Sequence, residues 1–113
     1  GAGALIISNH GGRVLDSVIA PINALPAIRN AVGPQLPLLL DSGVRHGTDI
    51  FKALALGASA ALIGRPQLHS LAVAGMLGTA HMLHVLRTEL ELAMAQMGCA
   101  DLGRIRQELL AGR

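Results

Sequence analysis

The chain has 113 residues, a formal net charge of +2 and 51% hydrophobic residues, and Phe51 is its only Phe, Tyr or Trp. This length allows one domain at most, and the aliphatic content is enough for a core. The weak, dispersed charge and the lack of aromatic side chains argue against a nucleic-acid-binding protein. The longest apolar run, 53–64, is too short to span a membrane and no signal peptide opens the chain, so we expect a cytoplasmic protein.

Aliphatic runs alternate with amphipathic segments along the first part of the chain. Short apolar runs bounded by glycine predict buried strands, and Pro21 and Gly33-Pro34 mark the two ends of a helix. A second helix should begin near Thr48 or Asp49, with Thr48 as its N-cap, and end at Gly57. The predicted strands are 4–8, 36–40 and 60–63, and the predicted helices between them are 22–32 and 48–57.

The remainder of the chain is predicted to be helical. After the break at Gly64-Arg65-Pro66, helical sequence resumes from about Leu68. Apolar residues spaced three or four apart then predict one long helix over 76–97, which Gly98 ends. These residues are Leu83, Leu86, Leu90, Met94 and Met97. A short helix over 102–110 completes the predicted elements.

Strands that alternate with helices predict an α/β fold with parallel pairing and right-handed crossovers. A closed barrel of eight such units typically needs ~250 residues, so three units make fewer than half of one. We therefore expect residues 1–113 to be a single partial domain, the C-terminal part of a larger barrel; a small open sheet is the alternative. Unpaired strand edges predict a missing N-terminal segment, a partner chain or self-association as a homo-oligomer.

Polar residues beside glycine follow all three predicted strands. The carboxyl ends of neighbouring parallel strands meet at one edge of a sheet, so these side chains should converge on one pocket. Backbone N–H groups at Gly43 and Gly64, together with Arg45 and Arg65, suit an oxyanion such as a phosphate. Histidine supplies a base near neutral pH and arginine a fork for a carboxylate, which makes His10 and Arg13 candidate site residues.

Four motifs in one order resemble the FMN-dependent α-hydroxy acid oxidases and dehydrogenases, the family of glycolate oxidase, lactate oxidase and mandelate dehydrogenase. The first, S-N-H-G-G-R at 8–13, resembles the family's active-site signature. D-S-G-V-R at 41–45 is similar to its D-G-G-V-R phosphate loop. G-T-D-I-F-K-A-L-A-L-G-A at 47–58 and I-G-R-P at 63–66 match its later motifs. The resemblance implies the C-terminal part of a TIM (β/α)8 barrel.

The resemblance also implies roles for particular residues. His10 corresponds to the catalytic base, which takes the α-hydroxyl proton while hydride passes to flavin N5; in a competing carbanion route it takes the α-proton. Arg13 corresponds to the residue that holds the substrate carboxylate by paired hydrogen bonds, so His10 and Arg13 are the implied substrate-binding residues. The implied FMN-binding residues are Ser8, Asp41, Ser42, Gly43, Val44, Arg45, Gly64 and Arg65. The implied reaction is oxidation of a small L-2-hydroxy acid to the 2-oxo acid.

Departures from the family pattern leave an alternative open. The family's substrate-binding tyrosines, its flavin-contacting lysine and the aspartate that orients the histidine lie upstream of the region that this chain resembles. The chain could therefore be a silent fragment that only associates or binds the FMN phosphate. An inosine-monophosphate-dehydrogenase-like barrel is disfavoured because Cys99 follows the long helix. Ser42 stands where glycine is commoner, which we expect to be tolerated at a negative φ.

The other chemically capable residues are expected to be structural. Cys99 should be a small buried hydrophobe. His81 and His84 have helical spacing but no third ligand nearby, so no metal site is expected. Lys52 should lie on the exposed side of its helix, and His46 at a rim.

Overall fold

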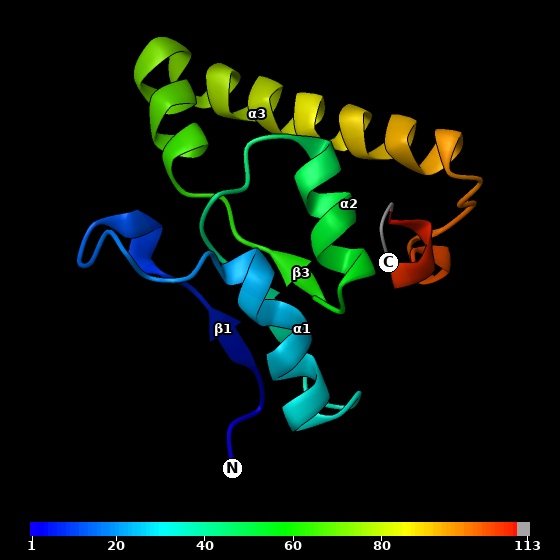
Figure 1. Cartoon of the computed structure of the whole chain (residues 1–113). Helices are drawn as coiled ribbons and strands as arrows, with labels where there is room; N and C mark the ends of the chain where they lie inside the picture. Colours follow the sequence, from blue (N-terminus) through cyan, green and yellow to red (C-terminus); the bar gives the residue numbers. More distant parts are fainter. Residues whose placement is uncertain (111–113) are drawn as a thin grey trace.

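The computed structural model describes residues 1–110, which form three short strands and three helices (Figure 1). The elements follow the predicted strand–helix order. Strands β1, β2 and β3 span Leu5–Ile7, Leu38–Leu40 and Ala60–Ala61, and helices α1, α2 and α3 span Pro21–Val32, Gly47–Ala55 and Arg65–Gln96. Single 3-10 turns occupy His10–Gly12, Leu102–Arg104 and Gln107–Leu109. Within 1–110, no helix combines the length and hydrophobicity that crossing a bilayer requires.

The three strands form one parallel sheet in the order β1-β2-β3. Leu5 pairs with Leu38 and Ile7 with Leu40, while Leu39 pairs with Ala60. Parallel neighbours joined through helices are the arrangement that the alternating pattern predicts. The carboxyl ends of β1, β2 and β3 therefore lie together at one edge.

The main core lies between one face of the sheet and helices α1 and α2. Successive strand residues point to opposite faces, so Ile7 is buried at 8% exposure while its neighbour Ile6 is 62% exposed on the other face. This core is built from the aliphatic residues that dominate the sequence, and every buried member of the cluster is aliphatic. It consists of Ile7, Leu25, Leu38, Leu40, Val44, Ala53, Leu56 and Ala58.

Helix α3 crosses over the start of α2 (Figure 1), and the contact depends on Gly47. A Cβ atom on Gly47 would collide with the backbone of α3 at Leu86 and Leu90. The Gly47 N–H donates to Glu89 Oε2 of α3 at 2.6 Å. Thr48 was expected to be the N-cap of α2, but the N-cap is His46, two residues earlier, and Thr48 lies inside the helix. Asp49 bonds back to the N–H groups of Arg45 and His46, both at 3.0 Å, and leaves Thr48 no capping role.

The long C-terminal helix is present, with a break near its start. Ala74 and Gly75 have φ of −147° and 56°, so the helical backbone is interrupted there and resumes at about the position predicted for the long helix. Leu86 is buried, but Leu83 is 54% exposed and Met97 40%. The predicted apolar stripe is thus covered only in its middle part.

The predicted short helix over 102–110 is wrong. Two 3-10 turns replace it, because Ile105 and Arg106 have extended backbone between them, with ψ of 117° and 157°. The extended backbone lets Ile105 bury its side chain in a second cluster with Phe51, Ala55 and Cys99. Burial at that position outweighs the helical pattern of the segment. Cys99 is buried, as expected.

Arg29 of α1 binds backbone carbonyls near the amino ends of β2 and β3. Its guanidinium donates two hydrogen bonds to the Gly57 carbonyl, at 3.1 and 2.7 Å, and one each to the Gly33 and Leu36 carbonyls, at 2.7 and 2.8 Å. Gly57 has φ of 101°, and a Cβ there would lie 3.0 Å from Arg29 Cγ. One side chain thus satisfies three carbonyls that no helix or strand uses.

Arg29→Met should lower the free energy of unfolding by about 2–4 kcal/mol, because it leaves several partly buried carbonyls without donors. Urea unfolding followed by circular dichroism measures the change. Arg106→Met, at an exposed arginine, is the matched control and should have little effect. Equal unfolding midpoints for the two variants would contradict the role given to Arg29.

Candidate functional site

The ends of β1 and β2 are joined by a hydrogen bond between side chains. Ser8 follows Ile7 and Asp41 follows Leu40, and these preceding residues are register partners in the sheet. The Ser8 hydroxyl donates to Asp41 Oδ2 at 2.5 Å. Ser8 and Asp41 follow the strand alternation to the face opposite α1 and α2. The two predicted site residues therefore meet where neighbouring strands end.

Ser42 extends this contact into the loop that follows β1. Its hydroxyl donates to Asp41 Oδ2 at 3.1 Å and accepts the Gly11 N–H at 3.0 Å. Ser8 Oγ accepts the next amide along, the His10 N–H, at 3.0 Å. One carboxylate thus holds two hydroxyls, and each hydroxyl holds one amide of the His10 loop.

Ser42 was expected to be tolerated if its φ is negative, and that condition is not met: φ is 80°. Left-handed backbone favours glycine, and a residue with a Cβ adopts it at a cost. The hydroxyl bonds to Asp41 and Gly11 offset that cost here. The only sequence signal for a positive φ at Ser42 is that the family's motif commonly has glycine at this position.

In the His10 loop, defined as residues 9–13, every backbone N–H from His10 to Arg13 donates a hydrogen bond within the protein. His10, Gly11 and Gly12 all have positive φ, of 57°, 66° and 74°. The Gly12 and Arg13 N–H groups donate to the Asn9 and His10 carbonyls. Because serines take the other two amides, His10 and Arg13 can bind a ligand only through their side chains, both of which are exposed.

Hydrogen bonds hold the pKa of Asp41 below its ordinary value of 3.8. The Ser8 hydroxyl is the largest cause, followed in the opposite direction by partial burial, which raises the pKa. Ser42 lowers it further through its side chain and backbone, and the nearby charge of His10 adds a small lowering effect. Asp41 is therefore ionised at neutral pH and accepts hydrogen bonds.

A cleft of about 180 Å³ lies between the ends of β2 and β3 and the start of α3. Seven of the eight predicted FMN-binding residues line it, the exception being Ser8. No backbone bond within 1–110 uses the N–H of Gly43, Val44 or Gly64. Free amides, an open helix start and two arginines are the donors that a phosphate needs. These donors fit the phosphate end of FMN. The predicted FMN-binding residues that line the cleft are Asp41, Ser42, Gly43, Val44, Arg45, Gly64 and Arg65.

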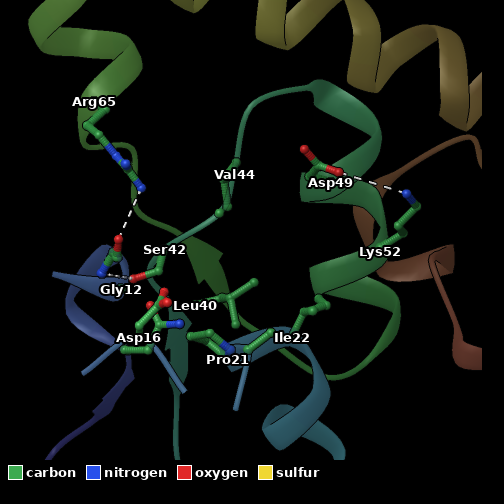
Figure 2. A pocket seen from close by; sticks show the side chains of 14 residues that line it. Gly12, Asp16, Pro21, Ile22, Leu40, Ser42, Val44, Asp49, Lys52 and Arg65 are labelled. Atoms are coloured by element: carbon green, nitrogen blue, oxygen red, sulfur yellow. Dashed lines mark hydrogen bonds and ion pairs between the residues drawn. The ribbon is translucent and has the colours of Figure 1, made fainter. Parts of the chain in front are cut away.

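A larger cleft of about 420 Å³ lies beside the first, between the His10 loop and α2 (Figure 2). Arg65 points down from the start of α3 and donates to the Gly11 carbonyl at 3.3 Å. Asn9, Asp16 and Lys52 also line this cleft. The sequence singled out neither Asn9 nor Asp16, and Lys52 was expected to lie away from the site. Asn9 Oδ1 is buried without a partner among the described residues. Only its place within the S-N-H-G-G-R motif could have pointed to it.

The remaining candidates lie on the surface. Lys52 is exposed, as expected, and its ammonium lies 3.8 Å from Asp49 Oδ1. His46 is exposed with Nδ1 3.5 Å from Glu89 Oε1. His81 and His84 are exposed along α3. Across residues 1–110, no group of three or more His, Cys, Asp or Glu residues is arranged to bind a metal.

Comparison with known proteins identifies one family. The model of the family described as FMN-dependent dehydrogenase matches residues 1–112. The chain belongs to this family. It is 60% identical over 110 residues to the L-lactate oxidase of Alicycliphilus denitrificans and 51% identical over 108 residues to glycolate oxidase 1 of Zea mays. Those alignments cover 97% and 96% of this chain, and 30% and 29% of the relatives.

Solved structures of family members share the fold. A soluble mutant of the membrane-associated (S)-mandelate dehydrogenase from Pseudomonas putida superposes with a TM-score of 0.94 at 42% identity, covering all of this chain and 32% of that one. A mandelate oxidase superposes at 0.90 with 45% identity over 95% of this chain and 33% of its own. These relatives are TIM-barrel flavoenzymes, and the described residues form part of such a barrel. The chain spans about 30% of the length of its relatives.

Asp41→Asn should destabilise the protein by about 1 kcal/mol at pH 7, because it weakens the hydrogen bonds from both serines. A lowered pKa in the folded state stabilises the fold above the ordinary value of 3.8, and this contribution is lost as pH falls through the folded pKa. The difference between wild type and variant should therefore be constant from pH 7 to about 5 and shrink on further acidification. Urea unfolding at several pH values measures it. A difference that stays constant to pH 3 contradicts the assignment; Asp16→Asn, at an exposed carboxylate of the same loop region, is the control.

Proposed function

We propose that the protein oxidises a small L-2-hydroxy acid to the 2-oxo acid, and that this chain supplies the substrate-binding His10 loop and the flavin-phosphate cleft. One observation carries the proposal. The Ser8–Asp41–Ser42 hydrogen bonds hold the His10 loop against the cleft that suits a phosphate. A base (His10), a guanidinium for the substrate carboxylate (Arg13) and an anion site then lie at the carboxyl ends of the strands. The position in the barrel that fits these motifs is its C-terminal part.

The side chains of His10 and Arg13 divide the work on the substrate. An imidazole near neutral pH takes a proton from the hydroxy acid. The Arg13 guanidinium donates paired hydrogen bonds to the carboxylate and fixes the α-carbon relative to His10. FMN, when bound, supplies the acceptor for the two electrons that leave the substrate. Both arginine and histidine are exposed here, so the rest of the barrel has to exclude water from them.

The cleft residues hold the cofactor. Arg45 and Arg65 provide charge for the phosphate, and the N–H groups of Gly43 and Gly64 provide donors without a side chain in the way. Ser8 and Asp41 face the same edge and are suited to the sugar-alcohol chain next to the phosphate. Arg45 Nη1 donates to the Val44 carbonyl at 3.0 Å, which holds its guanidinium close to the loop.

Exposed apolar residues locate the surfaces that other parts of the protein cover. Ile6, 62% exposed, lies on the sheet face opposite the helices, which in a closed barrel is the interior. Val73 and Met76, beside the break in α3, are 86% and 79% exposed. We propose that further barrel strands cover the first surface and that self-association covers the second.

A second candidate is that this chain binds FMN phosphate or associates without turnover. The exposure of the His10 and Arg13 side chains, which leaves the proposed base open to water, is the observation that favours it. Anaerobic addition of L-lactate, glycolate or (S)-mandelate to the flavin-loaded protein separates the two, since bleaching of the yellow flavin requires substrate oxidation.

His10→Asn in the full-length protein should lower the rate of anaerobic flavin reduction at least ~100-fold, the range for loss of a general base. Asparagine tolerates the left-handed backbone of this position, so the loop should persist and the visible spectrum of bound FMN should be unchanged. Stopped-flow absorbance measures the rate.

Arg13→Met is the matched variant in the same loop. It should mainly raise KM, by about 10- to 100-fold, because the carboxylate loses a charged pair of hydrogen bonds.

Reduction by His10→Asn at the wild-type rate with any of the three acids would refute His10 as the base.

Arg65→Met should weaken FMN binding at least about 10-fold, since one charged partner of the phosphate is lost. Titration of the apoprotein followed by flavin fluorescence gives the Kd. Riboflavin, which lacks the phosphate, should bind both proteins equally, and Arg87→Met on the exposed face of α3 should leave the FMN Kd unchanged. An equal loss of affinity for FMN and riboflavin would contradict a phosphate contact.

A further inference from the structure

The peptide group of Gly11, in the middle of the His10 loop, is held from both sides. Its N–H donates to Ser42 Oγ at 3.0 Å, and its carbonyl accepts Arg65 Nη2 at 3.3 Å (Figure 2). Ser42 follows β2 and Arg65 begins α3, so the two partners come from the two loops that line the phosphate cleft. Gly11 is itself part of the wall of that cleft.

Ser42 holds this position against its own backbone preference. Its φ of 80° suits glycine. What a glycine could not provide is the hydroxyl, which accepts from Gly11 and donates to Asp41 Oδ2 at 3.1 Å. Asp41 stays ionised because its pKa is lowered, so the hydroxyl proton is directed toward the carboxylate and a lone pair is left for Gly11. The orientation of the serine is thereby fixed.

We propose that Ser42 is a positioning residue that clamps the Gly11 peptide and so sets where the His10 imidazole stands relative to the phosphate cleft. The role in the reaction rests on the proposed function of His10. Ser42 makes this contact through a side chain on the β2–α2 loop, whereas Ser8 holds the adjacent His10 amide from β1 itself. Within residues 1–110, Ser42 bonds the His10 loop directly from the loop that carries Arg45, whereas the link through Ser8 reaches Asp41 of that loop from the end of β1.

Two substitutions separate the hydrogen bond from the backbone strain. Ser42→Ala removes the hydroxyl and keeps a Cβ at positive φ, so it should lower the Tm. Ser42→Gly removes the hydroxyl but relieves the strain, so its Tm should equal or exceed that of wild type. Ser59→Ala, at an exposed serine with no side-chain hydrogen bond within the described residues, is the control.

Amide hydrogen exchange at Gly11 in the full-length protein measures the clamp directly. Exchange should accelerate about fivefold or more in both Ser42 variants, the change expected for loss of one hydrogen bond, and stay unchanged in Ser59→Ala. The Gly57 amide, bonded to the Leu54 carbonyl at the far edge of the sheet, should be unaffected. Unchanged Gly11 exchange in Ser42→Gly would overturn the clamp.

The limiting rate of flavin reduction, at saturating FMN and hydroxy acid, measures the positioning. It should fall about fivefold or more in Ser42→Gly even though that variant is no less stable, which a purely structural role would not cause. An unchanged limiting rate overturns the positioning role. If the wild type reduces flavin with none of L-lactate, glycolate and (S)-mandelate, the proposed function fails, and Gly11 exchange still decides the clamp.

Discussion

The Asp41 carboxylate is the group on which the arrangement of the site depends. Its Oδ2 accepts the hydroxyls of Ser8 and Ser42, and these accept the amides of His10 and Gly11. A loop with three successive positive φ values has only one 3-10 turn of its own to hold it, so this network satisfies its other two amides. A neutral residue could not hold both hydroxyl protons as strongly, because hydrogen bonds to an ionised acceptor are the stronger kind.

The loop that follows β2, residues 41–46, is fixed from its other end by α3. Glu89 accepts the Gly47 N–H, and Asp49 accepts those of Arg45 and His46. Acidic side chains at the start of α2 match the positive end of the helix, and Gly47 allows the close approach that brings Glu89 there. The segment from Asp41 to Gly47 is thus held by Ser8 at one end and by α3 at the other, which keeps Arg45 on the cleft that Arg65 also lines.

The sequence predicted the strand–helix order well, because the signals were local. Pro21 starts α1 and Gly57 adopts its left-handed conformation after α2, and both follow from the residue's own backbone. What it could not predict depends on distant partners. Thr48 loses its capping role because Asp49 bonds back, residues 102–110 lose their helix because Ile105 reaches a core built by Phe51, and Ser42 takes positive φ because Asp41 and Gly11 hold its hydroxyl.

The two halves of the site use their backbone in opposite ways. All four amides from His10 to Arg13 donate within the protein, so a substrate carboxylate meets only side chains, and its recognition depends on where the loop holds them. At the cleft the N–H groups of Gly43 and Gly64 are free of backbone partners, so a phosphate can be bound by the main chain itself. Under the proposed function, binding of the cofactor should therefore tolerate side-chain changes better than turnover does, since the proposed turnover needs His10 and Arg13 in one geometry that the serine–aspartate network maintains.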